Sequence, residues 1–151
     1  MLKKKLGLNA IEESWFIGGR LAISFKIPST LIIPEGCERI GVNVLYGCRK
    51  LREVIIPKSV EIIGIGAFWC CRRLKKVTIL EGCKEIGNRA FKGCDKLREA
   101  VISESVEKIG DEAFYDCKGA TIILKKLRYE FMNIGNLAFW GCKDVKEEIR
   151  S

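Results

Sequence analysis

Eight cysteines are the residues of this 151-residue chain with the widest choice of chemistry, and five of them recur at a nearly fixed spacing. Thiols can pair as disulfides, bind zinc or act as nucleophiles. A zinc site needs clustered ligands such as paired C-x-x-C motifs, and the sequence contains neither that motif nor a histidine. The spacing instead predicts a buried column of reduced thiols at one repeated position, formed by Cys48, Cys71, Cys94, Cys117 and Cys142.

The remaining three cysteines fall at other positions of the same pattern. Cys37 and Cys83 stand where neighbouring units carry Val60 and Val106, so we expect both in the core. Cys70 stands where other units carry glycine or aspartate. It is therefore predicted to point outward and to be the thiol that a reagent labels first.

Other candidates for catalysis are few. Without histidine, Ser-His and Cys-His nucleophile pairs are excluded. Glu53 and Glu99 share one repeated position, but Lys76 occupies it in the unit between them, which places the carboxylates roughly 10 Å apart at the usual strand spacing. We therefore predict no enzyme, no catalytic residue, no metal site and no cofactor.

The elements that position these residues follow from a repeat. A nine-residue phrase such as "IGNRAFKGC" recurs along the chain, and we call each copy a return segment. Each copy begins with an Ile-Gly pair, and these pairs start at residues 17, 40, 63, 86, 109 and 134. A fixed period of 20 to 50 residues is typical of a solenoid, in which each unit buries its apolar side against its neighbours.

The other half of each unit reads Leu-x-x-apolar-x-Ile, as in "LREVIIP" from residue 51 and "LKKVTIL" from residue 74. Val77 and Ile79 alternate with Lys76 and Thr78, which is the period of a strand with one buried face. We expect these strands to align as a parallel sheet.

The return segment should lie opposite the sheet. The glycine after the isoleucine suits a turn with unusual dihedral angles. Asn88 or Asp111 beside it could cap a short helix, and Ala90 and Phe91 should then face the core. Phe91→Ala is expected to be costly and Lys92→Ala nearly silent.

Residues 48–71, "CRKLREVIIPKSVEIIGIGAFWCC", resemble the BspA-like class of leucine-rich repeats almost position by position. The resemblance implies an α/β solenoid: a right-handed leucine-rich-repeat coil with a parallel β-sheet on one face and short helices or turns on the other. It also implies a curved rod, often displayed on bacterial or protozoan surfaces, that binds other proteins.

The predicted domains are an N-terminal cap at 1–16, a solenoid of five to six repeats at 17–142 and a C-terminal cap at 143–151. The last unit carries two extra residues, and two registers remain open there. Either Ile122 and Leu124 or Ala120 and Ile123 face inward.

Composition agrees with a folded domain, with 48% hydrophobic and 30% charged residues and a net charge of +8. Polar residues interrupt the apolar run that a secretory signal needs, and no segment approaches a membrane helix. The chain as written is therefore expected to be cytoplasmic, with a cell-surface or secreted location as the alternative if it is a fragment of a longer protein.

Two surfaces are candidates for binding. The first is the outward face of the sheet, at Thr30, Ile32, Glu53, Ile55, Lys76, Thr78, Glu99 and Val101. The second is a basic edge after the cysteines, at Arg49, Lys50, Arg72, Arg73, Lys96, Lys118 and Lys143.

The predicted function is non-catalytic protein–protein interaction through the sheet face. Two alternatives stay open: weak binding of an acidic polymer (nucleic acid or an anionic surface) along the basic edge, and a fragment or paralogue of a surface adhesin-like protein. The expected partner is another protein, with nucleic acid less favoured, no membrane insertion, and end-to-end self-association left open.

Overall fold

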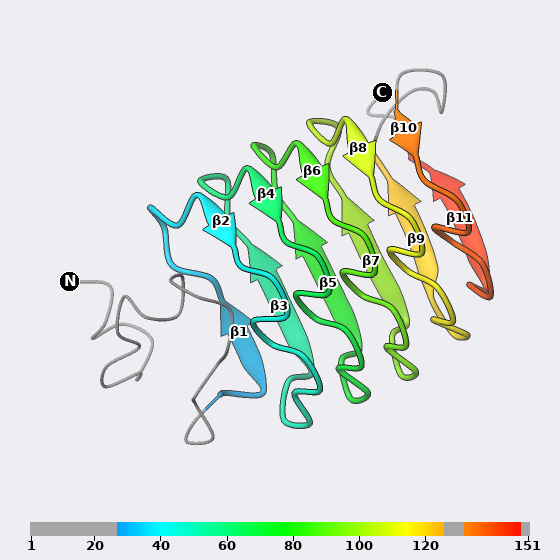
Figure 1. The fold of residues 1–151 in the computed structure, drawn as a ribbon, viewed down its shortest axis with the longest axis horizontal. Helices are drawn as coiled ribbons and strands as arrows, with labels where there is room; N and C mark the ends of the chain where they lie inside the picture. Colours follow the sequence, from blue (N-terminus) through cyan, green and yellow to red (C-terminus); the bar gives the residue numbers. More distant parts are fainter. Residues whose placement is uncertain (1–26, 126–131, 149–151) are drawn as a thin grey trace.

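The computed structural model describes residues 27–125 and 132–148, which wind into a parallel β-solenoid (Figure 1). Each turn carries one longer strand and one two-residue strand. The longer strands form a sheet in the order β1 (Thr30–Ile32), β3 (Glu53–Ile56), β5 (Lys76–Ile79), β7 (Glu99–Ile102), β9 (Thr121–Leu124) and β11 (Asp144–Glu147). The short strands form a second sheet from β2 (Arg39–Ile40), β4 (Ile62–Ile63), β6 (Glu85–Ile86), β8 (Lys108–Ile109) and β10 (Asn133–Ile134).

Neighbouring strands pair parallel and in register at the repeat spacing, which confirms the predicted parallel-sheet solenoid. Val54 pairs with Val77, and Val77 with Ala100, so inward positions follow one another along the rod. In the irregular last unit, Ile122 and Leu124 are the buried residues of β9. The first of the two open registers is therefore the observed one.

The expectation of short helices on the return side is wrong for the residues that the structure describes, where the return segments are successive turns. Each segment carries two residues with positive φ, four residues apart, such as Arg89 (φ 57°) and Gly93 (φ 68°). An α-helix cannot continue through a left-handed residue. Asn88 therefore caps no helix; its Oδ1 accepts a hydrogen bond from the Asp111 amide of the next turn at 2.9 Å.

Backbone amides of the return segments donate alternately within one turn and to the next turn. Ala90 donates to the Gly87 carbonyl at 3.2 Å, whereas Phe91 donates to the Ala113 carbonyl at 2.7 Å. Each turn thus supplies acceptors for the turn before it. This is why the nine-residue phrase recurs once in each turn.

The Ile-Gly glycines serve close approach of backbones, and the expectation that they supply unusual dihedral angles is wrong. Gly87 does not have positive φ. A Cβ atom on Gly87 would lie 2.8 Å from the Gly64 carbonyl carbon and from the Ile63 oxygen of the preceding turn. Only a residue without a side chain fits between stacked turns at this corner.

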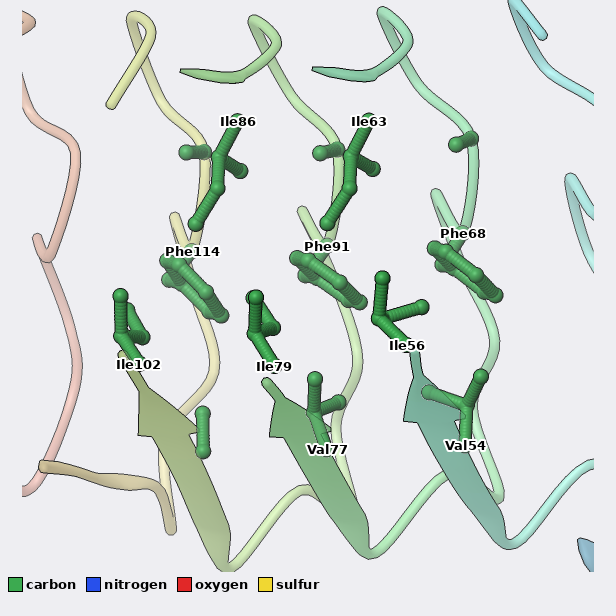
Figure 2. Close-up of a cluster of buried hydrophobic side chains, with 14 of the residues drawn as sticks. Val54, Ile56, Ile63, Phe68, Val77, Ile79, Ile86, Phe91, Ile102 and Phe114 are labelled. Atoms are coloured by element: carbon green, nitrogen blue, oxygen red, sulfur yellow. The ribbon is translucent and has the colours of Figure 1, made fainter. Parts of the chain in front are cut away.

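The core lies between the two sheets and the return segments (Figure 2). Phe68, Phe91 and Phe114 are fully buried at equivalent positions. Their rings stack nearly parallel, with centroids 5.0 Å apart for the first pair and 4.9 Å for the second. This column fills the inside of successive turns, while valine and isoleucine side chains from the strands close it on the sheet side.

The predicted cap at 1–16 lies outside the described residues. At the other end, Asp144–Glu147 adds β11 to the large sheet, parallel to β9. A capping role for 143–151 stays a prediction. Within 27–125 and 132–148, no helix is long and apolar enough to cross a membrane.

Candidate binding surfaces

The outward face of the large sheet carries an apolar row that crosses successive strands. Strand register aligns these residues directly, one to a strand: Ile32, Ile55, Thr78, Val101 and Ile123. Ile32 is 46% exposed, and the others are half-buried by their neighbours on the face. We call this set the apolar row.

A second row, two residues earlier in each strand, is polar. Glu53, Lys76 and Glu99 follow one another in register, between Thr30 at one end and Thr121 at the other. Lys76 Nζ lies 3.1 Å from Glu99 Oε1. The lysine therefore lies between the two glutamates on adjacent strands.

All eight residues predicted for the sheet face lie on this one face. Thr121 and Ile123 lie on the same face and were not predicted from the sequence, because the register of the last unit was open. The signal was present in the alternation of "TIIL", which matches that of the preceding strands once Ile122 is placed inward.

All seven predicted basic-edge residues are exposed. They lie where each return segment leads into the next long strand, along the lower edge in Figure 1. Three further cations, missed from the sequence, continue this edge: Arg52, Lys75 and Arg98. Backbone hydrogen bonds align them on consecutive turns, since the Lys75 amide donates to the Arg52 carbonyl at 2.7 Å and the Arg98 amide to the Lys75 carbonyl at 2.9 Å. The sequence pattern that could have revealed them is a basic residue at the same position in three successive units.

The regularly spaced cysteines form a column of thiols that hydrogen-bond to the preceding turn. Cys71 Sγ donates to the Leu45 carbonyl at 3.1 Å, and Cys94 Sγ to the Phe68 carbonyl at 3.3 Å. Burial raises the pKa of both thiols. Cys117 is buried like these two, whereas Cys48 and Cys142 at the ends are half-buried.

The described cysteines are all free, and among the described residues no three potential ligands gather closely enough to hold a metal ion. Cys83 is buried as predicted, and its burial raises the pKa of the thiol to about 12. Cys37 is half-buried. Cys70 is also half-buried and adopts a left-handed conformation (φ 58°), so its first labelling by a thiol reagent stays a prediction.

The return side presents aromatic and charged side chains that the sequence analysis did not single out. Tyr115 and Trp140 stack with ring centroids 4.8 Å apart, and Lys92 Nζ lies 4.6 Å from the Tyr115 centroid. Glu112 accepts hydrogen bonds from Lys92 and Arg89, which hold the pKa of its carboxyl below the usual value. In the sequence, Lys92, Tyr115 and Trp140 share the variable seventh position of the return segment, and Arg89 and Glu112 share the fourth.

The parallel turns, the buried leucine ahead of β3, β5 and β7 and the column of phenylalanines and cysteines define a leucine-rich-repeat solenoid. The sequence matches the family described as BspA type Leucine rich repeat region, in 6 copies over residues 9–146. The chain belongs to this family, as the resemblance had indicated. The family is one of repeat scaffolds, and the match indicates no catalytic family.

Solved structures of bacterial leucine-rich-repeat proteins have the same fold. A leucine rich repeat protein from T. pallidum is 28% identical, with a TM-score of 0.68 over 78% of this chain and 58% of its own. A leucine rich cell surface protein from Faecalibacterium prausnitzii is 26% identical, with a TM-score of 0.65 over 80% of this chain and 32% of its own. The chain thus spans between about a third and three fifths of these relatives. No match is found among curated proteins.

Proposed function

We propose that the protein is a non-catalytic recognition module that binds another protein through the outward face of the large sheet. The observation that carries the proposal is the apolar row, which lies in register across five strands. Exposed apolar groups that lie together are typical of protein-binding surfaces. Leucine-rich-repeat families are generally protein-interaction modules, which supports this choice.

The polar row beside it suits recognition rather than strong attraction. Lys76 forms an ion pair with Glu99 on the surface, where such pairs contribute little stability. A partner with complementary charges would be aligned by this row, while burial of Ile55, Val101 and their neighbours supplies most of the affinity. Binding should therefore weaken less than about threefold between 50 and 200 mM salt, because screening acts mainly on exposed charges.

The test uses a photo-crosslinking residue placed at Thr78, in the middle of the apolar row, or at Ile62 on the second sheet. The protein captured from Thr78 is identified by mass spectrometry, purified, and titrated against the wild-type chain and single variants. Ile55→Asp and Val101→Asp should each weaken binding at least about tenfold, because a buried unpaired carboxylate is costly. Ile62→Asp is the matched control.

Equal loss in all three variants, or capture from Ile62 alone, would place the interface elsewhere. Full affinity in Ile55→Asp and Val101→Asp would contradict the apolar row as the contact.

A surface location is part of the same proposal. The F. prausnitzii relative is a cell surface protein, and this chain spans 32% of it. Labelling of intact cells of the source with a membrane-impermeant amine reagent should modify the protein. Protection until lysis would instead favour the cytoplasmic expectation.

A further inference from the structure

Charge is divided between the two corners of the turns from β1 to β8. The segments that lead into the long strands, at 49–52, 72–75, 95–98, 118–120 and 143, carry one acidic residue, Asp95, and ten basic ones. We call these ten the extended basic edge: Arg49, Lys50, Arg52, Arg72, Arg73, Lys75, Lys96, Arg98, Lys118 and Lys143. The opposite corners, at 33–38, 57–61, 80–84 and 103–107, carry six acidic residues against Lys58 and Lys84.

This division is not a consequence of composition alone. The described residues carry 19 basic and 16 acidic side chains, a net charge of only +3, whereas the segments of this one corner carry ten basic residues and one acidic residue, a net charge of +9. All ten cations are exposed. Of these ten, within the described part of the chain, only Arg72 and Lys118 lie within 4 Å of a carboxylate, at 3.8 Å from Asp95 and 3.6 Å from Asp116. The edge therefore presents a continuous positive potential to solvent.

The arrangement fits a polymer better than a small anion. Successive turns are stacked at the strand spacing of about 4.8 Å, so one to three cations recur at that interval along a line. No single point gathers them into a pocket. A linear polyanion laid along the rod would meet every turn at once and release a counterion at each contact.

The side chains present also narrow the class of polymer. Proteins that hold single-stranded nucleic acids combine cations with aromatic platforms for the bases. The segments of the extended basic edge contain no aromatic residue. Five of the ten cations are arginines, whose planar guanidinium groups match the oxygens of sulfate or phosphate. A polymer that carries oxyanions but no bases can therefore pair with every cation of the extended basic edge.

We propose that the extended basic edge is a binding site for a linear sulfated polysaccharide, distinct from the sheet face that binds protein. Arg52, Lys75 and Arg98 are its central contacts, because they lie in register on three consecutive turns. The basic residues before them flank the same path on the side away from the strands.

The test titrates the whole chain with fluorescent heparin and dextran sulfate, and with neutral dextran of matched length, at several salt concentrations. The sulfated polymers should bind and neutral dextran should not. With five contacts and a slope of about 0.7 per contact, affinity should fall roughly 100-fold from 50 to 200 mM salt. The triple variant Arg52→Glu, Lys75→Glu, Arg98→Glu should bind at least about tenfold more weakly at 50 mM, and its salt slope should fall by about two.

The matched control reverses three cations away from the edge: Arg39→Glu, Lys58→Glu and Lys84→Glu. Its net charge equals that of the first variant, so general attraction to a basic protein would weaken both alike. Loss confined to the edge variant, with both variants unfolding at the same urea concentration, supports the site. Equal loss in both would overturn it.

Two further probes decide the class of ligand. A 20-residue oligothymidylate and vesicles with one third anionic lipid should both bind more weakly than dextran sulfate at equal salt. Tighter binding of the oligonucleotide would show that the edge selects nucleic acid, and tighter binding of vesicles that it selects a membrane surface. Either result would overturn the polysaccharide proposal while leaving the proposed sheet-face function untouched.

Discussion

A fully buried phenylalanine in each of three middle turns joins that turn to its neighbours, since the rings stack directly on one another. Phe91 lies in the centre of this column and contacts Phe68 on one side and Phe114 on the other. A smaller residue there would remove apolar contact from three turns at once. The stacking also fixes the distance at which the return segments exchange backbone hydrogen bonds.

Phe91→Ala should lower the free energy of unfolding by about 3–5 kcal/mol, because it leaves a cavity that the stacked turns cannot easily close. Urea denaturation followed by circular dichroism measures this change. Lys92→Ala, expected from the sequence to be silent, is a poor control, since Lys92 bonds Glu112 and lies over Tyr115. Exposed Lys96→Ala should change stability by less than about 0.5 kcal/mol. Equal effects of Phe91→Ala and Lys96→Ala would contradict the inward placement of Phe91.

The thiol of Cys83 should make the fold sensitive to alkaline pH. Its pKa is about 12 in the folded state, against about 8.5 for an unfolded thiol. Above pH 8.5 the unfolded chain loses this proton while the folded chain keeps it, so stability falls as pH rises, by about 1.4 kcal/mol per unit up to the folded value. The loss is absent below pH 8.5.

Cys83→Val isolates this effect, because neighbouring turns already carry valine at the equivalent position, in Val60 and Val106. The variant should match the wild type at pH 7 in reducing buffer. By pH 10 it should be more stable by about 2 kcal/mol, as measured by urea unfolding. Parallel pH profiles of the two proteins would show that Cys83 ionises freely in the folded state.

Side-chain direction was predictable from the sequence wherever a residue type recurred. Period-two alternation placed Val77 inward and Thr78 outward, and the fixed spacing placed the cysteine column in the core. Arg52, Lys75 and Arg98 were missed because they lie just before the strands. There, only the hydrogen bonds between turns show that three residues far apart in the sequence form one line.

At the scale of elements, the return segment is where reasoning from local signals failed. An asparagine or aspartate ahead of apolar residues, as at Asn88 and Asp111, is a preferred N-cap of a helix. In the structure, amides that a helix would pair internally donate to the next turn instead, as Phe91 does to Ala113. The competing partner lies 22 residues away, so no short window of sequence reveals it. Contact with the preceding turn likewise explains the glycine of the Ile-Gly pair at 64, 87, 110 and 135.

Gly87→Ala should destabilise the protein by about 1–3 kcal/mol or more, because its Cβ would overlap backbone atoms of the preceding turn. Thermal unfolding compared with wild type gives the change. Gly119→Ala is the control, since the nearest atom to its added Cβ is the Leu97 carbonyl oxygen at 3.3 Å. If Gly119→Ala were the more damaging substitution, close packing at the Ile-Gly corner would not explain this glycine.

At the scale of the whole molecule, stacking of like turns creates surfaces that no single turn possesses. The apolar row and the extended basic edge each take one or a few residues from a turn and acquire their length from repetition. The solenoid and its family could be predicted because equivalent buried positions in every turn need side chains of similar size and polarity. The partners could not, because the residues that face outward differ from turn to turn and carry no packing constraint.

If turns are interchangeable units, removing one whole turn should leave a shorter rod of the same kind. Deletion of residues 72–94 joins Cys71 to Asp95, which restores the junction after a cysteine of the buried column and lets β7 pair with β3. Because stability in a solenoid sums over turns and their contacts, the variant should fold cooperatively but less stably. Its urea m-value should be smaller by roughly 15%, in proportion to the surface exposed on unfolding.

A deletion of residues 72–91, three residues shorter, is the matched control. It leaves Lys92, Gly93 and Cys94 between the turns, so the glycine corner, the phenylalanine column and the hydrogen bonds between return segments cannot all be in register. This variant should lose its sheet signal in circular dichroism or unfold in more than one step. Equal stability of the two deletion variants would show that the 23-residue period does not govern how the turns stack.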